Sequence, residues 1–387
     1  MVVAFFVTLR QIAIAMRILF TSFLLLVVAV VFSQSTNYYL FVGGYTAGKN
    51  EGISVYKFNA TDGTVQFVSK VKSDNPSYLA IGANGKYLYS VNEANKVRKG
   101  TATAFSFNKT TGTLTLLNQA LLGGGGPCYI SVDKANKWLV TANYFSGSVS
   151  VLNLKKDGFI DTLKQLFQHT GSSVNVQRQK EPHAHMAIFS PDEKQLFTND
   201  LGTDKINIYN FNPANKNTPF TPAVDSVIFS VAGNGPRHTA FHPTQKLMYV
   251  INELSGTIDV FDYKKGIRNV QTISTDTSNR LDKGSSDIHF SPDGKFLYAT
   301  NRGNYNNIVI YSVDAINGTL KYIGLEPTKG KTPRNFIIDP TGNFLLVANQ
   351  NSDSVIIFKR DKTTGLLTYT GQFETGNPSC LKLLAIE

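Results

Sequence analysis

Cysteine is nearly absent from this chain of 387 residues, in which only Cys128 and Cys380 occur. Two cysteines cannot form the disulfide framework of a small secreted domain, and no Cys/His spacing typical of a metal site is found. Gly-x-Ser-x-Gly is also missing, which disfavours a covalent serine mechanism. We therefore expect no metal and no cofactor.

Other patterns are missing as well. No long amphipathic helix pattern is visible, and no linker divides the chain, so a second domain is not expected. The net charge is +11, yet no run of Lys and Arg with interleaved aromatic residues marks a nucleic-acid surface. A mildly basic surface with a basic central pocket is the better interpretation, and it favours an anionic ligand.

The stretch from Gly235 to Leu254 is the element that recurs. It contains two predicted strands, Thr239 to Phe241 and Leu247 to Ile251, separated by a turn. In an antiparallel hairpin the start of the first strand and the end of the second lie at the same edge. Arg237 and Glu253 should therefore face the same rim of a sheet.

Similar stretches start at residues 76, 127, 182, 236, 286, 333 and 378, at intervals from 45 (333 to 378) to 55 (127 to 182). A period near 50 in an all-β pattern is typical of a propeller, with four strands to each blade. The sequence thus predicts an all-β fold, a seven-bladed β-propeller over residues 35–387 with four antiparallel strands per blade.

The seventh copy has only its innermost strand, Pro378 to Ile386, before the chain ends. Its partners are expected at the other end, from Tyr39 to Val68, so that N- and C-terminal strands close the ring in one blade. Cys128 and Cys380 then fall in blades two apart. A disulfide needs Cα atoms within about 7 Å, so a bond between them is not expected.

The first 34 residues do not belong to the repeats. Arg10 and Arg17 precede an apolar run from Ile18 to Phe32, and this predicts a signal peptide over residues 1–34, cleaved near Ser33. The alternative is an uncleaved anchor helix, but the run is short for a span of about 20 residues. We expect a secreted protein with no membrane association after cleavage.

Three segments interrupt the repeats. Asp161 to Gln179 is interpreted as an irregular insertion, with a short helical turn predicted from Phe159 to Gln168. Asn212 to Pro222 and Thr275 to Lys283 are predicted to be surface loops.

Asn59, Asn108 and Asn317 each begin an Asn-x-Thr sequon, the acceptor for N-glycosylation. All three are expected in turns between the third and fourth strands of a blade, on the rim opposite Arg237 and Glu253. Sugars there would leave the predicted site open. The alternative is that Asn-x-Thr occurs by chance, because it suits such turns.

Ionisable residues gather at one rim of four consecutive repeats, whereas the repeat starting at 127 offers almost none. They are His183, His185, Asp200, Arg237, His238, Glu253, Asp287, His289, Arg302 and Arg334. Inner strands line the channel of a propeller, so these side chains should converge on one half of its mouth. Burying them without partners would cost free energy, which indicates either a ligand site or a network of mutually paired charges that plugs the channel.

Two histidines need separate interpretations. His289 follows Asp287 by two residues and is either a site residue or an inner-strand side chain held by that carboxylate. His242 precedes Pro243 in a turn on the far rim and is expected at the surface.

The rim motifs resemble those of the seven-bladed propeller lactonases, a family of 6-phosphogluconolactonases and carboxy-muconate lactonising enzymes. The resemblance covers the predicted propeller. The motifs that carry it are Pro182-His183-Ala184-His185, Gly235-Pro236-Arg237-His238, Asn252-Glu253-Leu254, Asp287-Ile288-His289, Asn301-Arg302-Gly303 and Pro333-Arg334-Asn335-Phe336.

The resemblance implies metal-independent chemistry on an acidic lactone above the central channel. Glu253 is then the candidate base for water, and His183 the acid or the oxyanion partner, with His289 as a further catalytic candidate. An anion clamp is expected from guanidinium groups. The predicted substrate-binding residues are Arg237, His238, Arg302, Arg334, His185 and Asp287.

The predicted function is hydrolysis of an acidic sugar lactone, as in a 6-phosphogluconolactonase. A muconate-type lactonising enzyme and a secreted, non-catalytic propeller that binds carbohydrate or protein remain the alternatives, because pentose-phosphate chemistry is cytosolic and this chain is predicted to be exported. The expected partner is a small anionic lactone, with no nucleic acid, and the chain is expected to be a monomer.

Cleavage of the leader is directly testable. Because the apolar run ends at Phe32, we expect the exported protein to begin close to Ser33. Intact-mass and N-terminal peptide measurements on secreted protein check this. A mature protein that still carries Met1 or Met16 would contradict it.

Overall fold

The computed structural model describes residues 35–93, 99–264, 266–276 and 284–386. The predicted leader and its cleavage site lie outside these residues, as does most of the Thr275 to Lys283 loop. Thr36–Glu387 forms one compact unit. No helix in the described ranges is long and apolar enough to span a membrane.

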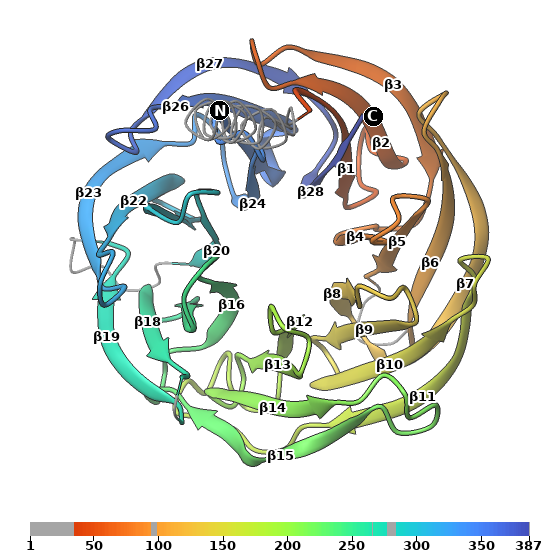
Figure 1. The fold of residues 1–387 in the computed structure, drawn as a ribbon, viewed down its shortest axis with the longest axis vertical. Coiled ribbons are helices and arrows are strands. Elements are labelled where there is room, and N and C mark those ends of the chain that lie inside the picture. Colours follow the sequence, from red (N-terminus) through yellow and green to blue (C-terminus); the bar gives the residue numbers. More distant parts are fainter. Residues whose placement is uncertain (1–34, 94–98, 265, 277–283, 387) are drawn as a thin grey trace, which may run out of the picture. The chain divides into compact units, whose positions relative to one another are not determined.

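Seven four-stranded antiparallel sheets follow one another around a ring in the described part of the chain (Figure 1). The seven-bladed propeller predicted from the repeats is confirmed. In chain order each blade runs from its innermost to its outermost strand, and the closing blade combines both ends of the chain. Its strands are β28 (Pro378–Ala385), β1 (Asn37–Gly44), β2 (Gly52–Asn59) and β3 (Val65–Lys72).

The other blades are numbered 2 to 7. Blade 2 has β4 (Leu79–Ile81), β5 (Tyr87–Asn92), β6 (Lys99–Asn108) and β7 (Thr113–Gly125); blade 3 has β8 (Pro127–Val132), β9 (Trp138–Asn143), β10 (Ser148–Leu154) and β11 (Ile160–Gln168); blade 4 has β12 (Ala184–Phe189), β13 (Gln195–Asp200), β14 (Lys205–Phe211) and β15 (Phe220–Phe229). Blade 5 has β16 (Pro236–Phe241), β17 (Leu247–Asn252), β18 (Thr257–Asp262) and β19 (Arg268–Ser274); blade 6 has β20 (Ser285–Phe290), β21 (Phe296–Asn301), β22 (Asn307–Val313) and β23 (Leu320–Pro327); blade 7 has β24 (Pro333–Ile338), β25 (Phe344–Asn349), β26 (Ser354–Arg360) and β27 (Leu367–Glu374).

The hydrophobic pattern of each strand follows its place in the blade. Second strands such as β17 and β25 are buried at every residue, because both of their faces pack against other blades. An outermost strand such as β27 alternates exposed and covered residues in its second half, from Thr370 to Glu374, as expected for a sheet with one face in solvent. The core is therefore divided among the interfaces between blades.

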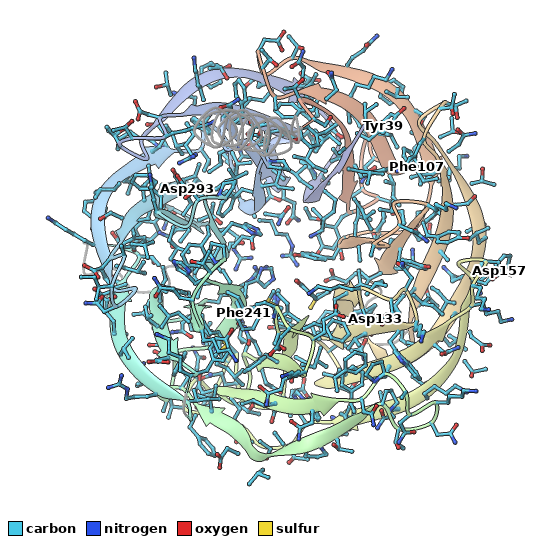
Figure 2. The ribbon with its side chains drawn as sticks, in the orientation of Figure 1. Tyr39, Phe107, Asp133, Asp157, Phe241 and Asp293 are labelled. Carbon is cyan, nitrogen blue, oxygen red and sulfur yellow. The ribbon has the colours of Figure 1, made fainter. Side chains whose placement is uncertain are left out.

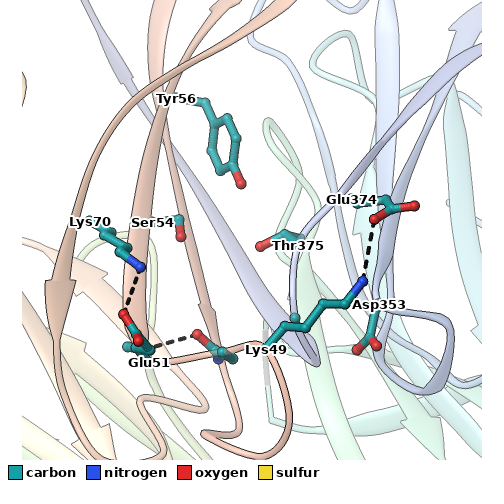
Figure 3. A pocket seen from close by; sticks show the side chains of 11 residues that line it. Lys49, Glu51, Ser54, Tyr56, Lys70, Asp353, Glu374 and Thr375 are labelled. Atoms are coloured by element: carbon teal, nitrogen blue, oxygen red, sulfur yellow. Dashed lines mark hydrogen bonds and ion pairs between the residues drawn. The ribbon is translucent and has the colours of Figure 1, made fainter.

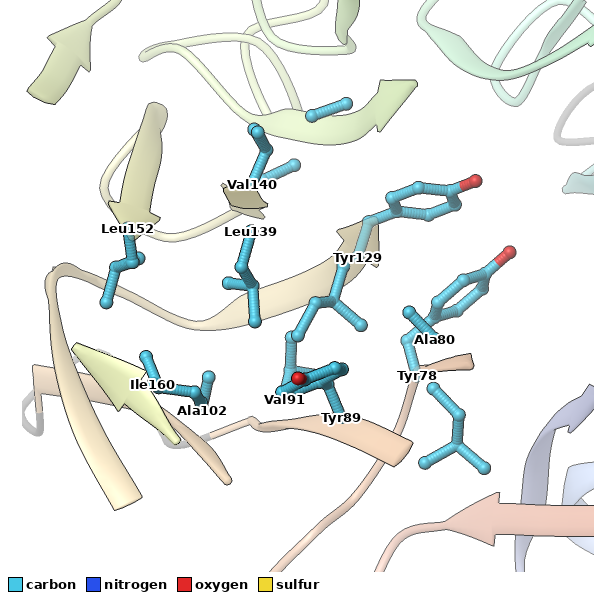
Figure 4. Close-up of a cluster of buried hydrophobic side chains, with 14 of the residues drawn as sticks. Tyr78, Ala80, Tyr89, Val91, Ala102, Tyr129, Leu139, Val140, Leu152 and Ile160 are labelled. Atoms are coloured by element: carbon cyan, nitrogen blue, oxygen red, sulfur yellow. The ribbon is translucent and has the colours of Figure 1, made fainter. Parts of the chain in front are cut away.

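Aromatic side chains fill those interfaces. Tyr78 and Tyr129 come from adjacent blades and lie side by side with ring centroids 4.3 Å apart (Figure 4). Nearer the outside, the rings of Tyr39 and Phe107 meet edge to face with centroids 5.0 Å apart, which joins the closing blade to blade 2 (Figure 2).

Ring closure depends on β28. This strand pairs with β1 over its length, with Leu383 opposite Leu40 and Leu381 opposite Val42. The pairing covers the inner edge of β1, which would otherwise be an open edge strand. The predicted closure by both ends of the chain in one blade is confirmed.

Two local predictions are wrong. The segment from Phe159 to Gln168 contains no helical turn: Ile160–Gln168 is β11, the outer strand that completes blade 3. Alternation of covered and exposed residues in β11 is typical of an outer strand. The Asn212 to Pro222 loop is also shorter than predicted, because β15 begins at Phe220.

Removing one closing contact should destabilise the ring. Leu381 is 1% exposed in the cluster between the closing blade and blade 7. We expect Leu381→Ala to lower the free energy of unfolding by about 2–5 kcal/mol, because it leaves a cavity. Urea unfolding measures this. Leu366→Ala is the control, since Leu366 is exposed; equal stability of the two variants would contradict the role of β28.

Candidate active site

In each blade the first strand begins, and the second strand ends, at the same rim. A β-bulge lies at this rim in most blades. In blade 5, Pro236 pairs with Asn252 and His238 with Ile251, so Arg237 is the extra, unpaired residue. Bulges re-aim side chains away from the ladder. At the same place the bulged residues of blades 3, 4 and 7 are Cys128, His185 and Arg334.

A second set of side chains follows the second strands directly. Each of these residues comes immediately after the last residue of a strand that ends at the rim. They are Tyr45, Glu93, Tyr144, Glu253 and Arg302. Bulge residues and post-strand residues therefore meet from different blades.

All of these side chains except that of Arg237 line a cavity of about 200 Å³. Its walls are formed by Tyr45, Glu93, Cys128, Tyr144, Phe145, Arg178, His185, Glu253, Arg302 and Arg334. The three arginines outnumber the two carboxylates, so the cavity is electropositive.

Glu253 is the most strongly paired group. Its Oε2 accepts from Arg237 Nε at 3.0 Å and lies 2.9 Å from Arg302 Nη2, while its Oε1 accepts from Arg178 Nη2 at 2.6 Å. Burial alone would raise its pKa, but the guanidinium charges of Arg302, Arg237 and Arg178 hold the pKa of the Glu253 carboxyl well below its usual range. Glu253 is therefore ionised at neutral pH.

Arg237 lies in a buried network beneath the cavity. It is 1% exposed, and its Nη1 donates to the carbonyl oxygen of Ser286 at 2.6 Å. His238 Nδ1 lies 2.7 Å from Asp287 Oδ1, and His289 Nε2 lies 3.0 Å from Asp287 Oδ2. Arg237 Nη1 also lies 3.3 Å from His238 Nε2, so Arg237, His238, Asp287 and His289 form one chain of contacts and are not residues of the cavity wall.

A second group occupies the opposite wall. Glu93 Oε2 accepts from Tyr45 Oη at 2.8 Å and from Ser77 Oγ at 2.6 Å, and it lies 4.0 Å from Arg334 Nη2. The Arg334 guanidinium sits over the Tyr45 ring, 5.4 Å from its centroid. Among the described residues it has no hydrogen-bonding partner, so its donors are available to a ligand.

The two histidines of the Pro-His-Ala-His motif face different surroundings. His183 Nδ1 donates to the Tyr144 carbonyl oxygen at 3.0 Å, and its ring stacks on Tyr144 at 4.3 Å. Because the carbonyl can only accept, the neutral tautomer leaves Nε2 unprotonated. His185 lines the cavity, and its buried Nδ1 has no partner in the described structure.

Comparison with known proteins now decides the family. A family model described as "Lactonase, 7-bladed beta-propeller" matches residues 39–383. The chain belongs to the seven-bladed β-propeller lactonases. The family predicted from the rim motifs is thus confirmed.

Relatives agree along nearly the whole propeller. A 6-phosphogluconolactonase of Formosa agariphila is 43% identical over 85% of this chain and 94% of its own length. One of Bacillus subtilis is 35% identical over 90% and 99%. The crystal structure of the periplasmic gluconolactonase of Pseudomonas aeruginosa superimposes with a TM-score of 0.86 at 34% identity, covering 91% of this chain and 100% of that one.

Several wall residues of this lactonase-family cavity were missed from the sequence. Arg178 lies in the segment interpreted as an irregular insertion, and Tyr144 and Cys128 come from the repeat judged to offer almost nothing. Glu93 and Tyr144 occupy the same repeat position as Glu253, directly after a buried Asn, and that signal could have found them. His242 is also not at the surface: it is buried, and its Nδ1 accepts from the backbone of Thr244 and Gln245.

Elsewhere, a depression of about 250 Å³ lies between the closing blade and blade 7. Figure 3 shows Lys49 reaching toward Glu374 and Lys70 toward Glu51, at 3.7 and 2.6 Å. All four side chains are largely exposed, and such ion pairs contribute little. The charges of these four side chains are thus paired with one another at an exposed surface.

The buried histidine beneath the cavity should make stability depend on pH. Burial and the charge of Arg237 lower the pKa of His238 to about 4. In the unfolded chain a histidine takes up its proton near pH 6.5. Between these values the unfolded state binds more protons, so stability falls as the pH is lowered from about 6.5 to 4.

Over this pH range we expect the free energy of unfolding to fall less in His238→Gln than in the wild type. The difference between the two falls should be on the order of 2 kcal/mol. Urea unfolding at pH 7, 6, 5 and 4.5 measures it. Identical pH dependence in both proteins would show that His238 does not contribute.

Proposed function

We propose that this protein hydrolyses an acidic sugar lactone of the 6-phosphogluconolactone type. The observation that carries the proposal is the electropositive cavity at the channel mouth, where Arg178, Arg302 and Arg334 surround two carboxylates. Membership of the lactonase family and the names of the relatives support it.

Arg334 is the proposed first contact of the acidic group. Its guanidinium has donors that no described residue uses, and a carboxylate or phosphate fits two of them at once. Arg302 also lines the cavity, where it forms an ion pair with Glu253 and donates to the carbonyl oxygen of Gly284. Arg237, His238 and Asp287 would then support substrate binding from below, by fixing Glu253 and the inner strands.

Hydrolysis requires water to be activated close to the lactone carbonyl. In the proposed step, Glu253 accepts a proton from water while the oxygen attacks the carbonyl carbon. Arg302 stabilises the oxyanion, the ring C–O bond breaks, and the alkoxide leaving group takes up the proton that water gave to Glu253. His183 is the proposed relay, because its Nε2 can accept this proton from Glu253 and donate it to the leaving group.

A second carboxylate reaches the same cavity. Glu93 Oε2 is hydrogen-bonded, whereas no partner of its Oε1 is found among the described residues. Glu93 is therefore the next candidate for the base if Glu253 does not have that role. His289 comes after it, because it is bonded to Asp287 and lies outside the cavity wall.

We also propose that the protein acts outside the cytosol. The apolar leader supports this, and the Pseudomonas aeruginosa relative is described as periplasmic. Asn59, Asn108 and Asn317 lie in or beside turns between third and fourth strands, where each Oδ1 accepts from the backbone two residues on. N-glycosylation of these asparagines and a monomeric state remain predictions.

The test is hydrolysis of a panel of aldonolactones with and without a 6-phosphate, followed by titration of released acid. We expect wild-type turnover, and Glu253→Gln to lower kcat by about 10²–10⁴-fold with little change in KM. Glu51→Gln on the outer surface is the control. Circular dichroism and the thermal midpoint establish that each variant is folded.

Two results would count against the proposal. Full turnover by folded Glu253→Gln would show that Glu253 is not the base. Glu93→Gln would then be the next variant to assay. Absence of hydrolysis by the wild type across the panel would favour a lactonising enzyme, tested with muconates, or a binding protein.

A further inference from the structure

The connection between β11 and β12 delivers one side chain to the cavity, that of Arg178. It is the cavity arginine that belongs to neither of the two repeated rim positions. Its side chain is 39% exposed, compared with 17% for Arg302 and 1% for Arg237. Of the three guanidinium groups that contact Glu253, it is thus the one most open to solvent and to an entering ligand.

The backbone around Arg178 is held firmly. Asn175 Oδ1 accepts from the backbone nitrogens of Gln177 and Arg178 at 3.1 Å. Gln179 is fully buried and donates through Nε2 to the carbonyl oxygen of Leu201 at 2.9 Å. Ser173 ties the start of this turn to Asp204 of blade 4. The turn is therefore a fixed support that aims Arg178 at the cavity.

The guanidinium of Arg178 uses only one of its nitrogens. Nη2 donates to Glu253 Oε1 at 2.6 Å and to Tyr144 Oη at 3.3 Å. Nε and Nη1 have no hydrogen-bonding partner among the described residues. Once Nη2 leaves Glu253, Nη2 and the neighbouring Nε or Nη1 form a two-donor fork that can hold two oxygens of a carboxylate or phosphate.

Only one of the two carboxylate oxygens of Glu253 has Arg178 as its partner. Oε2 keeps Arg237 and Arg302, whereas Oε1 accepts from Arg178 alone among the described residues. An anion that draws Arg178 toward itself leaves Oε1 available to water while two guanidiniums still hold the other oxygen. Binding of the acidic group and exposure of the carboxylate are then linked through one side chain.

We propose that Arg178 is a specificity residue. Its guanidinium leaves Glu253 Oε1 and binds the acidic group of the substrate instead. This proposal rests on the proposed lactonase function and names the residue that makes an anionic lactone preferred over a neutral one. Arg334, across the cavity, offers the second guanidinium for the same charged substrate.

The test compares two lactones that differ only in charge, a 6-phosphorylated aldonolactone and its unphosphorylated counterpart. We expect Arg178→Gln to lower kcat/KM for the phosphorylated lactone by about 10- to 100-fold, mainly through KM, because a charged hydrogen bond is lost. For the neutral lactone the fall in kcat/KM should be several-fold smaller, so the ratio of the two kcat/KM values measures the specificity. Arg178→Lys should recover part of the preference, since it keeps the charge but loses the planar fork.

Lys180→Gln is the matched control, because Lys180 is exposed two residues further along the same turn and its loss changes the net charge equally. It should behave as wild type on both lactones. Equal losses on both lactones in Arg178→Gln, or a loss in Lys180→Gln as large as in Arg178→Gln, would overturn the proposal.

Calorimetric titration with inorganic phosphate separates this proposal from the proposed function. Tighter phosphate binding by the wild type than by Arg178→Gln supports the anion role even if neither lactone is hydrolysed. Equal binding by the two proteins, or no binding by the wild type, overturns it whether or not lactones are hydrolysed.

Discussion

The antiparallel pairing of the two innermost strands in each blade is the constraint from which the site follows. It brings the start of one strand and the end of the next to the same rim, blade after blade. The bulge in the first strand turns one side chain out of the ladder, and the residue after the second strand has left the ladder altogether. Eight of the ten wall residues occupy one of these two positions.

The same constraint explains why a buried carboxylate can hold three guanidiniums. Arg237 precedes Glu253 in the same hairpin, Arg302 follows the corresponding strand of the next blade, and Arg178 comes from the connection into blade 4. Removing charges from water is costly unless each finds partners. Here the partners arrive from separate blades, so the ion cluster also ties neighbouring blades together at the channel mouth.

The repeats were sufficient to predict the architecture, because strand periodicity, turn residues and the incomplete last copy all concern local sequence. Glu253, Arg302, Arg334 and His185 were found for the same reason, since each falls at a repeated rim position. The connection between β11 and β12 is longer than the corresponding connections of the other blades, so the repeats gave no equivalent position to indicate that Arg178 enters the cavity. Which rim residues line the wall and which lie below it, as Arg237 does, depends on packing across the channel.

The bulged residues have a consequence for how such a protein changes over time. Because Cys128, His185 and Arg334 have no partner opposite them in their strands, ladder geometry does not select their identity. A substitution there alters the chemistry of the cavity while leaving the strand register intact. The fold thus separates the residues that preserve its architecture from those that select its ligand, and mutation can explore new substrates one blade at a time without first having to rebuild the ring.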